Sequence, residues 1–377
     1  MQYRNFGATQ EKVSVLGFGC MRLPLNSDDT KDINEAEAIR MIRHSIDQGV
    51  NYIDTAWPYH GEMSEPLVGK ALQDGYRDKV HLATKLPSWL INDPSDFDKY
   101  LNEQLDKLQT DHIDFYLVHT LNSRFWANLK EQGLFEFLDR LKDDPRVKHV
   151  GFSFHDDLPL FKEIVDAYDW SFCQVQLNYL DRDYQAGYEG MKYAADKGLG
   201  IVIMEPVRGG NLAHNIPQDI RSVMESTVEG RSPVDWALRW LWNMPEVHVI
   251  LSGMSEMPHV VENMQIAADS QANAMVQEEL DAIERVTDLY QSRIQVNCTQ
   301  CKYCMPCPHG VLIPRVFEFY NNAFIFEDKD SFKDTYNRFI PADKNASACV
   351  ACGVCEPKCP QNIPIIDSLA KTKALFE

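Results

Sequence analysis

An alternation between short apolar segments and longer amphipathic segments, repeated eight times, most constrains the fold of this 377-residue chain. The apolar segments have the length and the polar, Gly or Pro borders of buried strands, and the amphipathic segments have helical periodicity. The apolar segments are LGFGC from Leu16, NYIDTA from Asn51, VHLATKL from Val80, IDFYLVH from Ile113, VKHVGFSF from Val147, FCQVQLN from Phe172, LGIVIMEP from Leu199 and VHVILSGM from Val247. Eight strand–helix units within about 250 residues predict an α/β fold, a parallel (β/α)8 TIM barrel.

The helices of these units are expected at 35–48, 64–72, 96–108, 134–142, 158–168, 188–197, 234–243 and 258–267. Residues 28–34 and 121–133 are expected to be longer connections, and residues 1–15 a hairpin. An open doubly wound sheet is the alternative fold. It would require a Gly-rich phosphate turn that opens a helix after the first strand, and Gly17-Phe18-Gly19 is not followed by one.

Composition narrows the class of protein. The formal net charge of −19 disfavours nucleic acid and anionic membrane surfaces as partners. No apolar run approaches the roughly 18 residues of a membrane helix, and no basic-plus-apolar segment opens the chain. We therefore expect a cytoplasmic protein, in which cysteines stay reduced and metal binding is a more common role for them than disulfide formation.

Polar residues collect where the predicted strands end. The set is Asp54, Lys85, His119, Ser153, Gln176, Asn178, Glu205 and Ser252. In a parallel barrel the carboxyl ends of all strands lie at one mouth, which is where active sites of such barrels are found. The pattern therefore predicts an active site at this mouth.

Asp54, Lys85 and His119, together with Tyr59, form a coherent acid–base set if their strands are neighbours. A free Tyr has a pKa of about 10, but an adjacent ammonium group stabilises the phenolate and lowers that pKa. Lys85 would supply the ammonium group, and Asp54 would keep it charged and oriented. His119 would hydrogen-bond a substrate oxygen, while Tyr59 would be the general acid in carbonyl reduction or the base in alcohol oxidation.

The motifs around these residues resemble the aldo-keto reductase family. They are DTAWPYHG at 54–61, ATKLP at 83–87, LVHTL at 117–121, GFSFH at 151–155 and QLN at 176–178. The resemblance covers roughly residues 1–290. It implies an NAD(P)H hydride donor at the barrel mouth and a catalytic tetrad of Asp54, Tyr59, Lys85 and His119.

The resemblance also implies residues that contact the cofactor. Ser153, Gln176 and Asn178 match the family's nicotinamide contacts, and Glu205 ends the seventh strand beside them. Glu262 and Asn263 match its adenine contacts. Gly253 and His259 replace the basic pair that usually binds the 2′-phosphate of NADP, so the sequence leaves NADP and NAD both open, with Arg208 as a possible substitute cation.

Eight of the ten cysteines form two similar blocks near the end of the chain. They are Cys298, Cys301, Cys304 and Cys307, then Cys349, Cys352, Cys355 and Cys359. The second block is the ferredoxin run CxxCxxCxxxCP, in which the fourth Cys serves the other cluster. Two closely spaced cysteine pairs would suffice for zinc, so the triplets favour [4Fe-4S] clusters.

Crossed ligation predicts one cluster on Cys298, Cys301, Cys304 and Cys359, and a second on Cys349, Cys352, Cys355 and Cys307. The last spacing of the first block is one residue short, so a domain with a single cluster is the alternative. The stretches 315–326 and 331–339 read as aromatic-rich helices, which is typical of a small α-helical ferredoxin-like domain.

These observations predict an NAD(P)-dependent oxidoreductase of the aldo-keto reductase type in residues 1–290, joined to a 4Fe-4S ferredoxin-type domain in residues 291–377. Its partners would be a small carbonyl or alcohol substrate and a redox protein. Hydride transfer moves two electrons and a cluster moves one, so a flavin or a partner is the expected means of coupling them. Two alternatives stay open: an electron-carrier or docking protein on a barrel scaffold, and a reductase whose clusters are structural.

Overall fold

The computed structural model describes residues 1–214 and 216–377. The chain divides into two compact units, which we describe separately. One comprises Met1–Gly209 and Val234–Met275, and the other comprises Gly210–Pro233 and Val276–Glu377. No helix in the described part of the chain is both long and apolar enough to cross a membrane.

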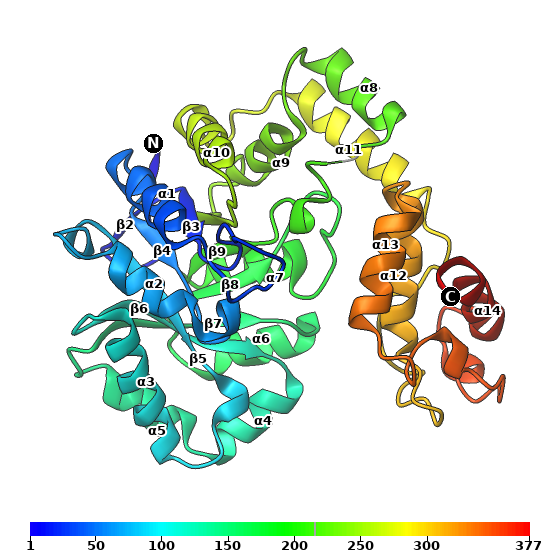
Figure 1. The fold of residues 1–377 in the computed structure, drawn as a ribbon, viewed down its shortest axis with the longest axis horizontal. Helices are drawn as coiled ribbons and strands as arrows, with labels where there is room; N and C mark the ends of the chain where they lie inside the picture. The colour runs from blue at the N-terminus through cyan, green and yellow to red at the C-terminus, as the bar shows by residue number, and fades with distance from the viewer. Residues whose placement is uncertain (215) are drawn as a thin grey trace. The chain divides into compact units, whose positions relative to one another are not determined.

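The first unit is built on a closed barrel of parallel strands in the order β10-β3-β4-β5-β6-β7-β8-β9 (Figure 1). The strands are β3 (Leu16–Gly19), β4 (Tyr52–Asp54), β5 (His81–Leu86), β6 (Ile113–Leu121), β7 (Val147–Phe154), β8 (Phe172–Gln176), β9 (Gly200–Met204) and β10 (Val249–Ser252). Each overlaps one of the eight predicted segments, so the predicted barrel is confirmed.

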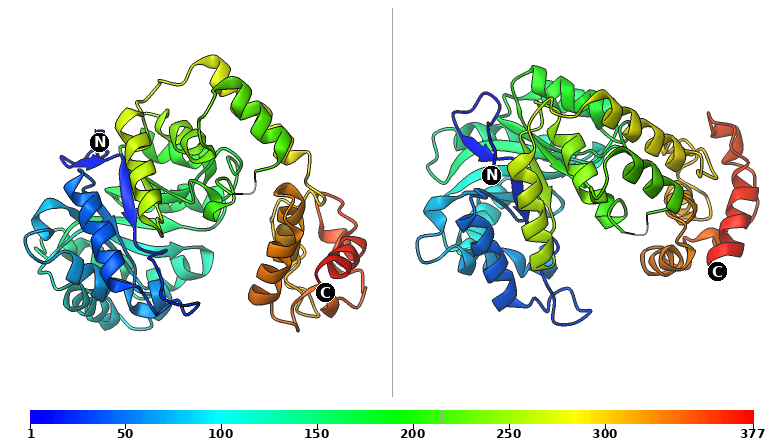
Figure 2. Two further views of the ribbon diagram at one scale, coloured as in Figure 1. Left: turned by 45° about the horizontal axis from the view of Figure 1, so that its top comes forward. Right: turned by 90° about the horizontal axis from the view of Figure 1, so that it is seen from above.

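Helices surround the strands of this unit (Figure 2). They are α1 (Glu35–Asp47), α2 (Ser64–Ala71), α3 (Ser95–Leu108), α4 (Ser123–Glu131), α5 (Leu134–Leu141), α6 (Leu158–Ala167), α7 (Gly187–Asp196), α9 (Pro233–Trp242) and α10 (Met257–Asp269). Eight of them match the expected ranges. The expectation of a plain connection at 121–133 was wrong: Asn122 caps α4 by accepting a hydrogen bond from the Phe125 N–H, and α4 buries Trp126.

An N-terminal hairpin closes the amino end of the barrel. Its strands β1 (Tyr3–Asn5) and β2 (Lys12–Ser14) are antiparallel, as predicted. The ring of Phe6 lies 4.8 Å from that of Phe115 inside the barrel. Gly7 follows with φ +55, and a Cβ there would lie 2.4 Å from the backbone nitrogen of Gly200. The hairpin can approach this closely only because position 7 has no side chain.

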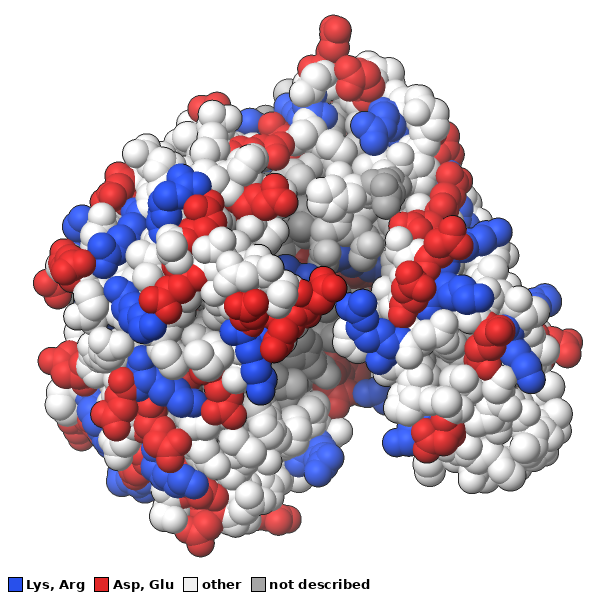
Figure 3. Space-filling view, in the orientation of Figure 1, with Lys and Arg blue, Asp and Glu red and all other residues white. Residues whose placement is uncertain are grey.

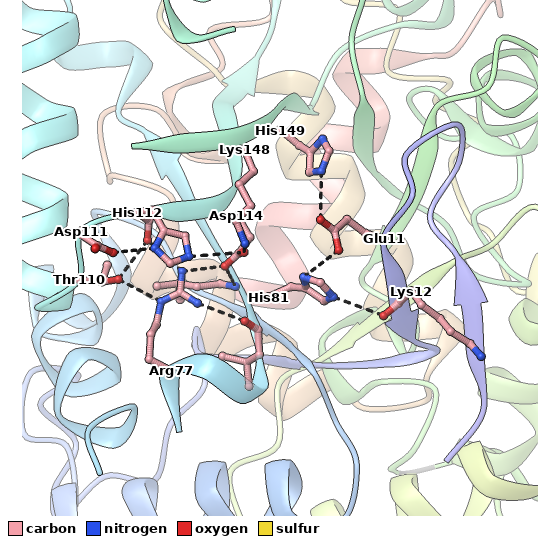
Figure 4. Close-up of polar contacts among 12 residues, drawn as sticks. Glu11, Lys12, Arg77, His81, Thr110, Asp111, His112, Asp114, Lys148 and His149 are labelled. Atoms are coloured by element: carbon pink, nitrogen blue, oxygen red, sulfur yellow. Dashed lines mark hydrogen bonds and ion pairs between the residues drawn. The ribbon is translucent and has the colours of Figure 1, made fainter. Parts of the chain in front are cut away.

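Buried charges at the same end are paired (Figure 4). The carboxylate of Asp114 in β6 is 2% exposed and accepts hydrogen bonds from Arg77, Lys148 and the Leu82 N–H. Glu11 of the hairpin lies between the rings of His81 and His149, at 3.8 and 3.6 Å. This end of the barrel is therefore closed by side chains that already have partners, which leaves the carboxyl mouth for ligands.

The second unit is helical. Its helices are α8 (Gln218–Thr227), α11 (Gln277–Gln291), α12 (Ile313–Ile325), α13 (Lys329–Phe339) and α14 (Ile365–Phe376). The aromatic-rich helices expected at 315–326 and 331–339 correspond to α12 and α13, whereas α8 and α14 were not anticipated. The rings of Phe319, Tyr336 and Phe376 pack together between α12, α13 and α14. These rings give the small unit its apolar core.

The surface carries charges of both signs. On the face shown in Figure 3, Lys and Arg side chains are interspersed with Asp and Glu.

Candidate active site and cysteine cavities

Three of the predicted catalytic residues lie on adjacent strands. Asp54 ends β4, Lys85 lies near the end of β5 and His119 near the end of β6, and these strands pair in that order. A β-bulge between Val118 and Leu121 interrupts the pairing of β6 with β7 beside His119. Bulges of this kind redirect side chains next to functional sites. The neighbouring strands that the acid–base hypothesis required are therefore present.

Lys85 and Asp54 form a buried ion pair. The Lys85 Nζ donates to Oδ1 and Oδ2 of Asp54 at 2.7 and 2.8 Å, and to the carbonyl oxygen of Thr55 at 2.8 Å. The Lys85 side chain is fully buried, and that of Asp54 is 2% exposed. Burial alone would lower the pKa of Lys85, but Asp54 and Tyr59 together outweigh burial and raise this pKa. Lys85 is therefore an ammonium group at neutral pH.

Tyr59 lies directly after β4 and faces this ammonium group. Its hydroxyl is 3.5 Å from the Lys85 Nζ, and its ring centroid is 5.0 Å from the same atom. Burial raises the pKa of Tyr59 above its ordinary value, while Lys85 acts in the opposite direction. Lys85 thus acts on the pKa of Tyr59 in the expected direction, but burial is the larger effect and the net shift is upward. The phenol keeps its proton at neutral pH in the ligand-free protein.

His119 is held neutral beside Tyr59. Burial, with Lys85 and His155 nearby, moves the pKa of His119 well below its usual range. Its ring centroid is 6.2 Å from that of Tyr59 in an edge-on arrangement. Its Nδ1 has no hydrogen-bond partner among the described residues. An imidazole in this state can give a hydrogen bond to a substrate oxygen without adding charge.

Two further residues of this site were missed by the sequence reasoning. His60 anchors the turn that carries Tyr59: its Nε2 accepts from the Leu23 N–H at 3.1 Å, and its Nδ1 therefore donates to the Thr30 carbonyl at 2.7 Å. Trp89 lies 5.4 Å from the His119 ring and is 36% exposed, so it flanks the mouth. His60 lies within the motif at 54–61 and Trp89 lies two residues after the motif at 83–87, and that position was the available signal.

The other side of the mouth holds the predicted nicotinamide contacts. The Ser153 hydroxyl accepts from the Thr120 N–H at 2.8 Å. The buried Asn178 donates to Asp181 and to the Glu205 carbonyl, both at 3.1 Å, and Gln176 donates to Asp181 at 3.4 Å. Asp181, which the sequence did not single out, thus connects two of these amides. It also pairs with Arg208 at 3.1 Å.

The predicted adenine contacts lie on α10. Asn263 is buried and donates to the hydroxyl of Ser252, the last residue of β10, at 2.9 Å. Glu262 precedes it on the same helix, and Gly253 follows Ser252 in the exposed loop between β10 and α10. The structure therefore places every predicted cofactor contact at strand ends or on the helix that follows β10.

The eight clustered cysteines line two cavities. Cys298, Cys301, Cys304 and Cys359 line one cavity. Cys307, Cys349, Cys352 and Cys355 line the other. Each cavity thus takes three thiols from one block and the fourth from the other. The buried Ile313 lines both cavities.

The cysteines around the two cavities suit iron-sulfur clusters better than zinc ions. Burial raises the pKa of Cys298, Cys304 and Cys355, so these thiols would give up protons only to a strongly bound cation. A zinc ion binds sulfur at about 2.3 Å and needs four sulfurs around a single point. Among the described residues, no three or more His, Cys, Asp or Glu side chains are arranged to hold a single metal ion. The four thiols around each cavity therefore suit a larger group of several iron and sulfur atoms better than one zinc ion.

Comparison with known proteins identifies a family for each of the two parts of the chain. The model of the aldo/keto reductase family matches residues 15–286, and that of a 4Fe-4S dicluster domain matches residues 297–363. L-galactose dehydrogenase of Arabidopsis thaliana is 26% identical over 312 residues, which are 76% of this chain and 95% of that protein. An uncharacterized oxidoreductase, YrpG of Bacillus subtilis, is 30% identical over 234 residues, covering 56% of this chain and 68% of that one.

Solved structures give the same answer for the barrel. The holo form of aldo-keto reductase AKR11C1 from Bacillus halodurans has a TM-score of 0.63 and 25% identity, and the match covers 76% of this chain and 96% of that one. The family match spans well over half of the chain and includes the strands that carry Asp54, Lys85 and His119. The chain is therefore an oxidoreductase that belongs to the aldo/keto reductase family and carries a 4Fe-4S domain in its C-terminal region.

Proposed function

We propose that the chain reduces a small carbonyl compound, or oxidises the corresponding alcohol, with NAD(P) as the hydride carrier and Tyr59 as the general acid or base. The observation that carries this proposal is the position of the Lys85 Nζ. It lies 2.7 Å from the Asp54 carboxylate and 3.5 Å from the Tyr59 hydroxyl, beside the neutral His119. One fixed ammonium group can therefore stabilise a phenolate that forms only during the reaction.

These contacts define a path for proton transfer between Tyr59 and the substrate. A bound nicotinamide supplies the hydride in reduction and accepts it in oxidation. His119 donates a hydrogen bond to the carbonyl oxygen and holds it near Tyr59. Tyr59 then gives its proton to the oxygen, and Lys85 stabilises the resulting phenolate. In the reverse direction the same phenolate takes the proton of the alcohol, which requires the enzyme with Tyr59 deprotonated.

We assign the cofactor to the two sides of the mouth described above. Ser153, Gln176 and Asn178 would hold the nicotinamide amide, because hydroxyl and amide groups at adjacent strand ends match its donor and acceptor. Glu262 and Asn263 would contact the adenine from α10. Glu205 and Gly253 directly follow the two strands between these regions, β9 and β10, and would border the phosphates. The contact of Asn178 with Asp181 pre-orients one of these amides.

For the C-terminal part, we assign two [4Fe-4S] clusters with crossed ligation. The support is that each cavity is lined by the four cysteines that crossed ligation predicts, including Cys307 despite its short spacing. Clusters exchange single electrons, and because Ile313 lines both cavities, the two clusters would be neighbours that can pass electrons to each other. We assign this role to residues 291–377 and the hydride chemistry to residues 1–290. Free thiols of this number fit a reducing, cytoplasmic setting and a redox protein as partner.

The experiment is the Tyr59→Phe variant, tested anaerobically in NAD(P)H oxidation with a panel of small aldehydes and ketones. Loss of the general acid should lower kcat by about 100- to 10,000-fold. Binding of the dinucleotide, followed by quenching of tryptophan fluorescence, should change little because the hydroxyl is a transition-state contact. Tyr76→Phe is the matched control, since that hydroxyl contacts Asp47 on an exposed surface.

Three results would contradict the proposal in different ways. Equal turnover of Tyr59→Phe and the parent protein would remove Tyr59 as the general acid. Binding of neither dinucleotide would favour an electron carrier that uses the barrel as a scaffold. Turnover that persists unchanged when the cluster ligand Cys352 is replaced by Ala would make the clusters structural.

A further inference from the structure

A buried carboxyl group outside the proposed tetrad lies on the helix side of β5. Glu65 belongs to the first turn of α2, and its side chain is fully buried. Its Oε1 accepts hydrogen bonds from the Thr84 hydroxyl and from Nε2 of Gln104, both at 2.6 Å. Its Oε2 has no hydrogen-bond partner among residues 1–214 and 216–377. The proton transfer proposed above gives this acid no role.

Glu65 is costly to keep in this place. Burial raises the pKa of its carboxyl group above the ordinary value. A buried carboxyl oxygen without a hydrogen-bond partner lowers the stability of a fold, whether the group is ionised or protonated. Stability therefore does not explain why an acid lies here. The explanation has to come from what its other oxygen holds.

Gln104 of α3 connects Glu65 to the backbone of Lys85. Besides its bond to Glu65, the Gln104 Nε2 donates to the Thr84 hydroxyl at 3.2 Å and to the Lys85 carbonyl oxygen at 3.0 Å. The Gln104 Oε1 accepts from the hydroxyl of Tyr116, in β6, at 2.9 Å. The amide is fixed in one orientation, because its oxygen and its nitrogen each have defined partners. The backbone of Lys85 is thus held from the helix side.

The same turn of α2 is also bonded to β4. The Ser64 hydroxyl donates to the Cys20 carbonyl oxygen at 3.0 Å and lies 2.8 Å from the Thr55 hydroxyl. The Thr55 carbonyl oxygen in turn accepts from the Lys85 Nζ at 2.8 Å. Because α2 begins shortly after the turn that carries Tyr59, its first residues connect this turn to both strands of the buried ion pair.

We propose that Glu65 is a positioning residue: by holding Gln104, it fixes Lys85 at the distance from Tyr59 at which the ammonium group stabilises the phenolate. The inference rests on the proposed function and deepens it. The distance of 3.5 Å between the Lys85 Nζ and the Tyr59 hydroxyl is already long for a hydrogen bond, so a small displacement of β5 would break this contact. A displacement of about 1 Å can lower a reaction rate by about 100-fold.

The test compares Glu65→Leu with Glu65→Gln in the anaerobically purified full-length protein. Leu removes the acceptor for Gln104, whereas Gln keeps an oxygen in the place of Oε1. The substrate is the aldehyde of the panel above that the parent protein reduces fastest. Glu65→Leu should lower kcat by about 10- to 100-fold. KM and dinucleotide affinity should stay close to the parent values, because Lys85 and Tyr59 act in the transition state. Glu65→Gln should keep the parent kcat.

The pH profile of alcohol oxidation separates positioning from a general loss of structure. The side chains that face Tyr59 are Lys85, Asp54, Cys20 and His119. Among them, the Lys85 ammonium group favours the phenolate, so kcat should rise with pH as Tyr59 loses its proton. In Glu65→Leu this rise should shift to higher pH, because Lys85 is displaced. A smaller folded fraction would lower kcat without moving the rise. Glu65→Gln removes the same carboxyl group, so an effect of its charge would appear in both variants.

Gln104→Met tests the same connection from α3 with little change in volume. It should reproduce the lower kcat and the shifted rise. Asp114→Asn is the matched control. Asp114 is a buried carboxylate with three hydrogen bonds at the amino end of the barrel, so its loss should cost stability but leave kcat of the folded protein unchanged.

Four results would overturn the inference and leave the proposed function standing. They are a parent-like kcat and pH profile in Glu65→Leu, the same in Gln104→Met, a Glu65→Gln variant as slow as Glu65→Leu, and failure of both Glu65→Leu and Gln104→Met to fold, which would assign the network to stability. A parent protein that reduces no carbonyl compound of the panel would overturn the proposed function as well.

Discussion

Replacing Lys85 with Met removes a buried positive charge and keeps most of the volume of the side chain. In the parent protein, Lys85 is fully buried and donates two hydrogen bonds to Asp54 and one to Thr55. The variant leaves the Asp54 carboxylate with 2% exposure and without its cation. We therefore expect a loss of folding stability as well as of activity.

The expected loss is about 3–5 kcal/mol in the free energy of unfolding. This is the usual cost of removing one partner of a buried ion pair, because the other charge stays buried without compensation. Burial raises the pKa of Asp54, and without Lys85 nothing in the pair opposes this. The loss should therefore shrink at acidic pH, where Asp54 is protonated in both states, and grow as pH rises above the unfolded-state pKa of about 4. Adding Asp54→Asn removes the orphaned charge and should restore most of the stability.

Urea unfolding, followed by tryptophan fluorescence, measures the free energy of unfolding of the barrel unit. All seven tryptophans lie within Met1–Gly209 and Val234–Met275, so the signal reports the barrel rather than the cysteine-rich unit. Lys70→Met is the matched control. Lys70 also makes a 2.7 Å ion pair, with Glu35, but both side chains are about half exposed, so its loss should cost less than about 1 kcal/mol.

Either of two results would contradict this role of Lys85. In the first, the free energy of unfolding of Lys85→Met lies within about 1 kcal/mol of that of the parent protein. In the second, the double variant with Asp54→Asn is as unstable as Lys85→Met alone. Either would mean that the charge on Asp54 is not what Lys85 compensates.

Two further predictions concern the barrel interior and the cysteines. Burial lowers the pKa of His248 to about 4, so the folded state binds fewer protons than the unfolded state and stability falls as pH drops from about 6.5 to 4. This residue alone would contribute about 3 kcal/mol to that loss, and unfolding curves of His248→Gln should show a weaker pH dependence. Crossed ligation predicts about eight irons and eight sulfides in the parent protein, and loss of about half in Cys307→Ser, measured by anaerobic iron and sulfide analysis with EPR.

The outcomes that would contradict these predictions are distinct. A His248→Gln variant with an unchanged slope of stability against pH would assign that slope to other groups. Iron content unaffected by Cys307→Ser, or about four irons in the parent protein, would restore the single-cluster alternative for residues 291–377.

The sequence alone determined the barrel and the positions of the candidate chemistry. Strands and helices differ in the period of their apolar residues, so eight alternations sufficed to predict the barrel and the mouth that collects Asp54, Lys85 and His119. Cysteine spacing was equally informative, because ligand geometry restricts which spacings can surround a cluster. The helix α4 was missed because a single cap at Asn122, between long apolar segments, is a weak local signal.

The tertiary structure decided what depends on approach between distant segments. The close approach of Gly7 to the backbone of Gly200 joins residues far apart in the sequence, and no local pattern predicts it. Cys307 lines the second cavity although its spacing is short, because the path of the backbone, and not the residue count, sets where the thiol lies. The pKa of Tyr59 rises because burial exceeds the effect of Lys85. The sequence predicts that Lys85 is the charged neighbour of Tyr59, but only the packed structure determines how deeply Tyr59 is buried.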